Sequence, residues 1–400
     1  MKNYLFYFTC FFILIFSFRE AQSASKPYQR AVILSGGGMQ FAQFIGMLDG
    51  ARFLNKEPDL IIGTCGGSLA TAIAQAFPNL DDAIAFTKSE SLYQLLRQAQ
   101  VNPDYTNLAH NLTRLYDFYQ KWLTNSIANV FADTVLHVPT RLGHPALEIP
   151  ITRTQKAVVI VAGRILFNKK DAGKKRRNRK LFSETFFTDP ITGSHLKGFE
   201  SPIEKATGDS AIDLNTEVNT TATLAEAARA AITGTYYMEP IQINGNYYMG
   251  GTVDLNPIEV AKELADETIA SFGEGFEPLT EMKATQAVYH YDINDRIRSI
   301  HDQEATYWVD ATDRKDLISQ AGFDPIYSAA KVRTQIPDTY EKFYNKVLTQ
   351  IEYGRERMIE ALTQARPNEK GHIRHMNSRN ASDELLQQYD RFVSRDSRER

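Results

Sequence analysis

The sequence of 400 residues contains only two cysteines, Cys10 and Cys65. A chain of this length can bury enough apolar surface to fold without cross-links, so this scarcity excludes a disulfide scaffold and predicts a core-stabilised globular protein. Cys10 lies in an N-terminal apolar run, whereas Cys65 stands alone within DLIIGTCGGSLATAIAQAF, residues 59–77. The position of this second thiol therefore needs an explanation.

The sequence also lacks a convincing membrane-spanning run. The apolar stretch at residues 5–18 is shorter than the about 20 residues that a spanning helix needs. Lys2 precedes it, and the small residues Ala21 and Ser23 follow it at the spacing of a cleavage site. The pattern predicts a signal peptide over residues 1–23 that is cleaved on export to the periplasm or out of the cell; an uncleaved N-terminal anchor is the alternative.

An excess of charge of either sign is missing as well. Lys and Arg number 45 against 48 Asp and Glu, which gives a formal net charge of −3. This balance offers no general attraction for nucleic acid, so none is expected as a partner. The cysteines and histidines show no metal-ligand spacing, so no metal ion is expected, and no cofactor.

Basic residues do concentrate in one segment, NKKDAGKKRRNRK at residues 168–180. A solvated surface loop is the simplest interpretation of such a run. Clustered Lys and Arg also attract anionic lipid head groups, and each contributes about 1 kcal/mol near a charged surface. A membrane surface is therefore a candidate partner through the basic loop, residues 169–180.

Strand-like and helix-like stretches alternate from residue 30 onward. The stretches typical of strands are AVILSGGG, DLIIGT, KAVVIVAGRILF, MEPIQIN and TQAVYHYDI, and those typical of helices are AQFIGMLDGARFL and SLATAIAQAF. This alternation predicts an α/β fold with a doubly wound, mostly parallel sheet and helices on both faces.

Residues 80–131 carry Leu, Tyr, Phe and Ile at three- and four-residue spacings, which predicts helical additions to the sheet. Most of these apolar side chains are expected in the core, and a lipid-facing cap is the alternative. We expect one α/β domain over residues 28–364, with its motifs at 30–264. The polar residues 365–400 predict a partly helical or mobile tail.

Three glycine-containing motifs indicate one site. Gly36, Gly37 and Gly38 follow a strand, and such a run lets backbone N–H groups turn toward an anion. Cys65 stands at the centre of GTCGG between a strand and a helix, which is the layout of a nucleophile elbow. INGNYYMGGTVDLNP, residues 243–257, supplies a further glycine turn. Each motif alone is weak evidence, and only their combination points to a particular chemistry.

Together the motifs resemble those of the patatin-like phospholipases, which are lipid acyl hydrolases with a doubly wound α/β fold. Members of that family carry an S-G-G-G-x-R-G oxyanion loop, a G-x-S-x-G elbow and a D-G-G or D-G-A turn, and they use a serine–aspartate dyad without histidine. The resemblance covers residues 30–264 and implies a lipid or fatty acid as ligand. It places the oxyanion loop at Gly36, Gly37, Gly38 and Gly66. The other matching positions are Gly46, Gly63, Gly67, Gly250, Gly251, Asn256 and Pro257.

The reactive residues of the family are replaced in this chain. The nucleophilic serine corresponds to Cys65 and the dyad aspartate to Met249. In the oxyanion loop, the arginine corresponds to Gln40 and the next glycine to Phe41, and both are candidate binding residues. Methionine cannot accept a proton, so the base is missing. Asp254 is the nearest carboxylate in the motif and the candidate substitute acid, although capping the next helix is its simpler role.

Two functions compete on this evidence. The absence of the dyad aspartate, which Met249 replaces, favours an exported, catalytically inactive pseudo-lipase that binds lipid or a protein partner. The alternative is an active lipid acyl hydrolase or acyltransferase with Cys65 as nucleophile, because a helix N-terminus can activate a thiol without a base. In a third interpretation, Cys65 only fills the elbow as a small buried residue.

Overall fold

The structure is a computed structural model that describes residues 25–132, 134–141, 143–272, 281–314, 327–328, 331–332, 334 and 336–363. The expected signal peptide and the expected C-terminal tail therefore lie outside the described residues. Within the described part, no helix is both long and apolar enough to cross a membrane.

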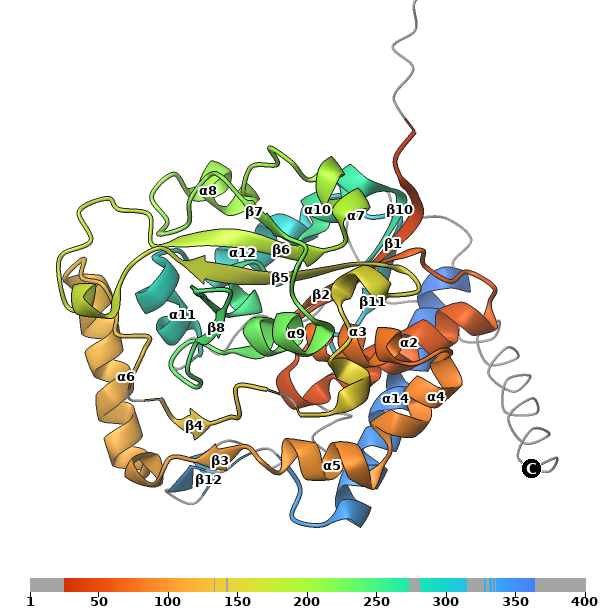
Figure 1. Ribbon diagram of the computed structural model, residues 1–400, viewed down its shortest axis with the longest axis horizontal. Helices are drawn as coiled ribbons and strands as arrows, with labels where there is room; N and C mark the ends of the chain where they lie inside the picture. Colours follow the sequence, from red (N-terminus) through yellow and green to blue (C-terminus); the bar gives the residue numbers. More distant parts are fainter. Residues whose placement is uncertain are drawn as a thin grey trace, which may run out of the picture.

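A nine-stranded sheet forms the centre of the molecule (Figure 1). Its strands are β1 (Tyr28–Leu34), β2 (Leu60–Thr64), β5 (Ala157–Ile165), β6 (Phe182–Thr188), β7 (Glu217–Asn219), β8 (Ile241–Ile243), β9 (Asn246–Met249), β10 (Ala265–Phe272) and β11 (Tyr307–Asp310). The order is β11-β10-β1-β2-β5-β6-β7, and the β8–β9 hairpin joins β5. The first five strands in this order are mutually parallel, whereas β6 is antiparallel to β5. The predicted mostly parallel sheet is confirmed.

Helices cover both faces of this sheet. They are α2 (Ala42–Phe53), α3 (Gly66–Ala76), α4 (Leu80–Thr87), α5 (Glu90–Leu96), α6 (Leu108–Leu123), α7 (Pro190–His195), α8 (Pro202–Thr207), α9 (Leu224–Ile232), α10 (Ile258–Leu264), α11 (Glu281–Tyr289), α12 (Ile293–His301) and α14 (Tyr340–Thr363). One core cluster includes α2, α3, α9 and α14, and a second includes α6, α10, α11 and α12. Along β1, Val32 and Leu34 belong to the first cluster while Ala31 and Ile33 belong to the second. Burial on both faces explains why the inner part of β1, residues 31–34, is a continuous apolar run.

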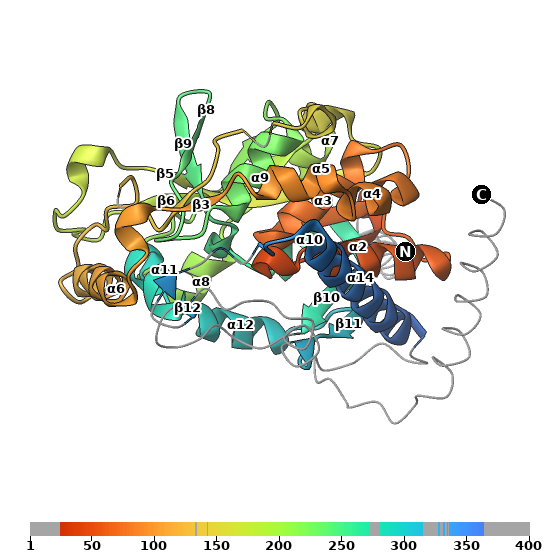
Figure 2. The ribbon, with the colours of Figure 1, turned by 90° about the horizontal axis from the view of Figure 1, so that it is seen from below.

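The last described helix, α14, lies beside α2 although the two are far apart in the sequence (Figure 2). The backbones approach so closely that a Cβ at Gly46 would lie 2.0 Å from the Ile351 carbonyl oxygen. A Cβ at Gly354 would meet the Gln43 carbonyl oxygen at 1.8 Å. Gly46, a position shared with the family motif, therefore serves helix packing rather than the site.

The helical additions predicted over residues 80–131 are present as the separate helices α4, α5 and α6, with the short strand β3 (Gln100–Val101) between the last two. One detail of the prediction needs correction. The stretch TQAVYHYDI, residues 285–293, does not form a strand. It contains the last residues of α11 and the first residue of α12. The buried residues Ala284, Ala287 and Val288 follow a helical spacing, which the alternation of Val, Tyr and His obscured.

Candidate functional site

Cys65 lies in a sharp turn between β2 and the N-terminus of α3. Its backbone has φ 47° and ψ −124°, a conformation that a non-glycine residue adopts only at a cost of about 1–3 kcal/mol. The Cys65 carbonyl oxygen accepts hydrogen bonds from the Ser68 amide at 3.0 Å and the Ser68 hydroxyl at 2.5 Å. The thiol-bearing residue is partly buried. This geometry is that of a nucleophile elbow, with the reactive position at the positive end of a helix.

The glycine loop after β1 lies directly against this elbow. A Cβ at Gly66 would lie 2.7 Å from the Gly38 carbonyl oxygen and 2.8 Å from its nitrogen. A Cβ at Gly36 would be 3.8 Å from the Cys65 Cβ. The residues expected to form the oxyanion loop are therefore brought together with the nucleophile position.

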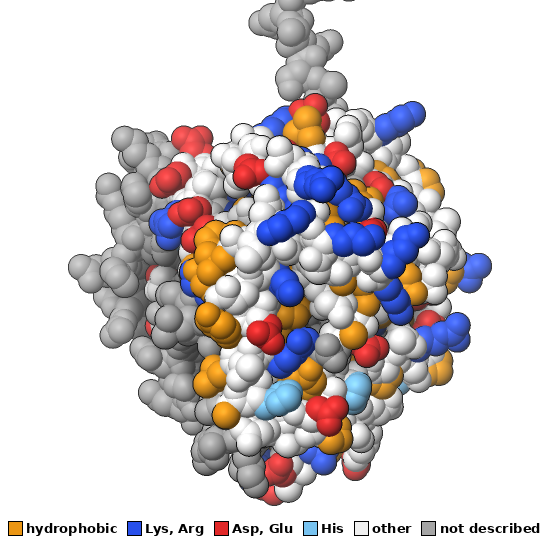
Figure 3. Space-filling view, turned by 90° about the vertical axis from the view of Figure 1, so that its left-hand side faces the viewer, with side chains coloured by type: hydrophobic (Ala, Val, Ile, Leu, Met, Phe, Trp, Pro, Cys, Tyr) orange, Lys and Arg blue, Asp and Glu red, His pale blue; other side chains and the backbone are white. Residues whose placement is uncertain are grey.

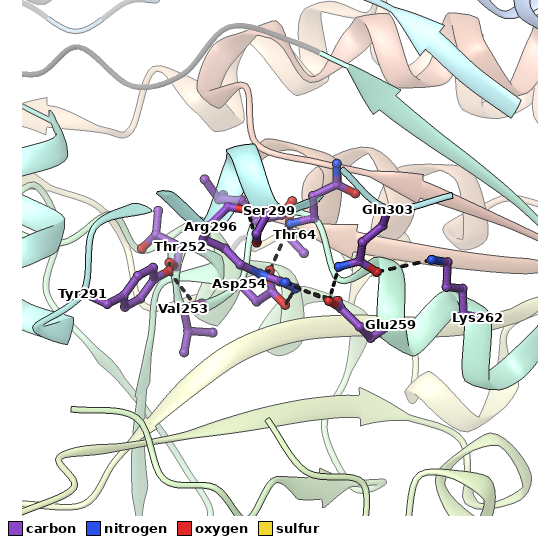
Figure 4. Close-up of polar contacts among 12 residues, drawn as sticks. Thr64, Thr252, Val253, Asp254, Glu259, Lys262, Tyr291, Arg296, Ser299 and Gln303 are labelled. Carbon is purple, nitrogen blue, oxygen red and sulfur yellow. Dashed lines mark hydrogen bonds and ion pairs between the residues drawn. The ribbon is translucent and has the colours of Figure 1, made fainter. Parts of the chain in front are cut away.

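The third motif meets the elbow from the other side. A Cβ at Gly251 would lie only 2.4 Å from the Cys65 nitrogen. The Thr64 hydroxyl donates to the Leu255 carbonyl oxygen at 2.7 Å, which ties the end of β2 to the same turn. Figure 4 shows Thr64 beside Thr252 and Asp254 in this arrangement. Three segments that are distant in sequence therefore converge on one place.

Met249 ends β9 immediately before this turn. Its side chain is fully buried and belongs to the same apolar cluster as Val253 and Tyr289, and Cys65 packs against that cluster. In the sheet, Met249 pairs with Gly163 of β5. The position that corresponds to the family's acid is therefore an apolar part of the core.

Gln40 and Phe41 follow the glycine loop in different environments. Phe41 is fully buried in the cluster of α2, α3 and α14, so a direct contact between its ring and a ligand would require the loop to move. Gln40 lies in a short 3₁₀ turn (Gly38–Gln40), and its Oε1 is buried without a hydrogen-bond partner among the described residues. Of the two, Gln40 carries the polar group near the loop.

Asp254 is buried and engaged in a structural network (Figure 4). Its Oδ2 accepts from Nη2 of Arg296 at 2.8 Å, and its Oδ1 accepts from the Asn256 amide at 3.3 Å. Arg296 also binds both carboxylate oxygens of Glu259, at 2.8 and 2.6 Å. Burial raises the pKa of Asp254, and the charge of Arg296 opposes this rise. The carboxylate thus fixes the turn before α10, but it does not cap that helix, because the N-cap residue is Pro257 and no side chain caps it.

Three polar side chains near these motifs were not predicted from the sequence. The Tyr289 hydroxyl approaches the glycine turn, since a Cβ at Gly250 would lie 2.4 Å from it. Burial raises the pKa of Tyr289, and nearby Cys65 adds to the rise, so the phenol stays protonated. Arg314 Nη1 lies 3.4 Å from the Gly36 carbonyl oxygen. Both residues come from segments far from the motifs, and no sequence pattern links them to the site.

Glu184 is the third of these residues. It pairs with Gly163 in the sheet, so Met249, Gly163 and Glu184 form one row across three strands. The side chain is fully buried next to the Ser201 hydroxyl, and no hydrogen bond of regular geometry reaches either carboxylate oxygen from the described residues. Burial, and then the charge of Asp254, raise the pKa of Glu184 to about 8. A single acid within the apolar stretch FSETFFT was the signal that could have revealed it.

Among the described residues, no group of three or more His, Cys, Asp or Glu side chains is arranged to hold a metal ion. The polar groups around the elbow are hydroxyls, an amide and paired charges, which suit an organic ligand.

The elbow, the glycine loop and the mostly parallel sheet are together typical of a hydrolase fold. A sequence model of the patatin-like phospholipases matches residues 32–262, more than half of the chain. The chain belongs to the patatin-like phospholipase family. No curated protein has a significant sequence match to this chain.

Two solved structures are similar to this chain. They are VipD from Legionella pneumophila, with a TM-score of 0.31, and the type III effector protein ExoU, with a TM-score of 0.29. Each is 12% identical and matches 84% of this chain. The matches cover 66% and 54% of those two chains, so this chain spans about two thirds and about half of their lengths.

Proposed function

We propose that this protein is an exported pseudo-lipase, which binds lipid or fatty acid at the Cys65 elbow without turning it over. The observation that carries the proposal is Met249, which is fully buried in an apolar cluster at the position of the dyad acid. A hydroxyl or thiol at the elbow then has no partner there that could accept a proton. The elbow and the glycine loop are retained, and these parts of the scaffold suit an acyl group.

The titratable side chains around the turn support this proposal. Asp254 is engaged by Arg296, and Glu184 has its pKa raised to about 8, so it holds its proton at neutral pH. Tyr289 is a protonated phenol and can donate but not accept a proton. All three side chains are fully buried, and none of them serves as a general base at neutral pH.

A second function rests on the backbone of Cys65. Its strained conformation at the start of α3 is the one that presents a nucleophile, and it persists although the dyad acid is absent. A thiolate at a helix N-terminus could attack an acyl carbonyl and form a thioester, with release of the alcohol. Hydrolysis of that thioester would need an activated water, so such an enzyme would accumulate acyl adduct or transfer the acyl group.

The partner and the compartment belong to the same proposal. Residues 1–23 act as a cleaved signal peptide, and the basic loop, residues 169–180, contacts an anionic membrane surface. Six of its cations have exposed side chains, namely Lys169, Lys170, Lys174, Lys175, Arg177 and Arg179. A protein partner at the same surface is the competing assignment.

Intact-mass analysis of the mature chain with phospholipids and activated short-chain esters tests both functions. We expect non-covalent lipid binding, no adduct on Cys65 and no turnover above buffer. Cys65→Ala should then bind lipid as the wild type does. A thioester adduct or a measurable kcat that Cys65→Ala abolishes would overturn the pseudo-lipase in favour of the acyl enzyme. Failure to bind any lipid, in a folded sample, would contradict both.

A further inference from the structure

Helix α6 has two apolar stripes that face different ways. Leu115 and Phe118 are buried in the core, whereas Leu112, Tyr116 and Leu123 are 49%, 60% and 54% exposed. With roughly 100° of rotation per residue, the three exposed side chains fall within about 40° of one another around the helix. They therefore form a continuous outward stripe, which we call the α6 stripe.

Exposed large hydrophobic side chains are concentrated on α6. Seven large hydrophobic side chains are exposed in the described part of the chain, and three of them make up the α6 stripe. Beside the stripe, Tyr119 stacks on Trp122 with ring centroids 5.3 Å apart, and Lys283 lies 4.8 Å from the Tyr119 ring. Clustered apolar surface of this kind marks an interaction site, and Tyr and Trp are the side chains typical of a membrane interface.

The basic loop is attached to the C-terminal end of α6. The Lys175 Nζ donates to the Thr124 carbonyl oxygen at 2.5 Å, and the Arg176 amide donates to the Asn125 carbonyl oxygen at 2.8 Å. Backbone hydrogen bonds at 2.8 Å also join Ile127 to the loop. The exposed cations of the loop therefore keep a fixed position relative to the α6 stripe.

Some cations of the basic loop form ion pairs within the protein and are not available to bind phosphate groups. Arg176 is buried and pairs with Asp209, and Lys180 pairs with Glu204, so these two cations anchor the loop from inside. Asp171 is the one acid of the loop and is shared by Lys174 and Arg179. The exposed face still carries more cations than acids. Figure 3, which looks onto this end of the molecule, shows Lys and Arg side chains gathered over its upper half and hydrophobic side chains beside and below them.

We propose that the α6 stripe and the basic loop form one docking surface for an anionic lipid bilayer. Leu112, Tyr116 and Leu123 enter the boundary between head groups and acyl chains, and the cations of the loop face the phosphates. An apolar helix face beside fixed cations has the chemistry of an interfacial membrane helix, and the charge complements an anionic surface. The inference rests on the proposed lipid ligand, because the same bilayer would supply it.

The docking surface is connected to the site through packed helices. Helix α6 packs against α11, which ends at Tyr289 near the glycine turn. The Tyr236 hydroxyl donates to the Asn111 carbonyl oxygen of α6 at 2.8 Å, and Tyr236 belongs to the same cluster as Met249. Helix α6 is therefore linked by packing to the glycine turn beside the elbow.

Flotation with vesicles tests this surface on the mature chain. Vesicles of phosphatidylcholine mixed with phosphatidylserine should bind the protein, and vesicles of phosphatidylcholine alone should bind it more weakly. The variant Leu112→Ser/Tyr116→Ser/Leu123→Ser should lose at least about tenfold in affinity, because the apolar insertion is removed. The variant Lys170→Glu/Arg177→Glu should lose at least about fivefold per cation and its remaining binding should depend less on salt.

Matched controls use exposed residues elsewhere. Ile191→Ser removes a side chain on α7 that is 73% exposed, and Arg97→Glu reverses an exposed charge at the end of α5. Both variants should bind within about twofold of the wild type. Because all the altered side chains are exposed, thermal unfolding should show each variant folded. A folded α6 variant that binds anionic vesicles like the wild type would overturn the proposal, and so would equal binding of neutral and anionic vesicles.

Tryptophan fluorescence gives a second, independent readout. The chain has two tryptophans: Trp308 is buried in β11, whereas Trp122 of α6 is half-buried at the edge of the core cluster and stacks on Tyr119, which borders the α6 stripe. Brominated phospholipids should quench the emission of Trp122, and Trp122→Phe should abolish the quenching. Binding of a soluble fatty acid at the elbow, measured without vesicles, should be unchanged by the α6 variants. If the wild type does not bind the fatty acid, the proposed function is contradicted instead. Failure of the docking surface and failure of the proposed function are therefore distinguishable.

Discussion

Gly251 lies so close to Cys65 that a Cβ at position 251 would be 2.4 Å from the Cys65 nitrogen. The turn that carries the family's acid motif is therefore part of the wall of the elbow, not a separate element. This contact holds Met249 and Cys65 in one site although nearly half of the chain separates them. It also makes the turn sensitive to any added side chain.

Gly251→Ala should consequently destabilise the protein. The new methyl group meets backbone atoms, which cannot rotate away, so we expect a loss of about 1–3 kcal/mol in the free energy of unfolding and weaker ligand binding. Gly234→Ala is the matched control, because a Cβ there would find its nearest neighbour at an ordinary 3.6 Å. Denaturant titrations of both variants give the comparison. Equal stability of the two would show that the elbow and the turn are not in tight contact.

Asp254 offers a test of whether the buried acid is structural. Removing it in Asp254→Ala leaves buried Arg296 with one carboxylate partner, Glu259, and leaves the Asn256 amide without its acceptor, so we expect a loss of about 1–3 kcal/mol in the free energy of unfolding. The exposed pair of Arg298 and Asp295 is the control, and Asp295→Ala should cost less than about 1 kcal/mol. Chemical denaturation measures both. A stable, folded Asp254→Ala that gains or loses chemistry at Cys65 would instead assign this acid to the site.

Glu184 should make the stability of the protein depend on pH. Its pKa is raised from 4.5 to about 8 in the folded state, so between these values the folded protein holds one proton more than the unfolded chain. The free energy of unfolding therefore decreases as the pH rises through this window, by up to about 1.4 kcal/mol per pH unit, and the decrease ends above pH 8. The contribution is fully present only below pH 4.5.

The variant Glu184→Gln cannot ionise, so the difference in stability between it and the wild type should grow in its favour from pH 5 to pH 8. Denaturation at several pH values measures this difference. Glu200→Gln, at an exposed carboxylate, should run parallel to the wild type. A parallel curve for Glu184→Gln would mean that the buried acid is already ionised or finds a partner.

Much of the fold could be predicted because its central strands are buried on both faces. The buried parts of strands β1, β2 and β5 are therefore mostly apolar runs, and each strand was assigned from the sequence. Strand β10 was missed because Asp266 and Glu267 near its start interrupt the apolar pattern. The glycine motifs predicted the elbow and its loop, since close backbone approach restricts those positions to glycine. Tyr289 and Arg314 could not be found in this way, because only tertiary packing brings them to the site.

The last prediction tests whether the site lacks only the two reactive side chains of the dyad and otherwise keeps the geometry needed for hydrolysis. Cys65→Ser together with Met249→Asp returns a hydroxyl and a carboxylate to the two positions of the family's dyad, on an elbow whose backbone already has the required turn. Weak hydrolysis of short-chain esters should reappear in this double variant and in neither single variant, because nucleophile and base act as a unit. Aspartate at 249 enters an apolar cluster, so some stability should be lost, although the Tyr289 hydroxyl near the adjacent turn can donate to it. The control Cys65→Ser with Met249→Leu keeps the apolar cluster and should stay inactive. If the folded Ser–Asp variant is also inactive while lipid binding persists, the pocket does not present an acyl carbonyl to residue 65, and the ligand binds in another orientation.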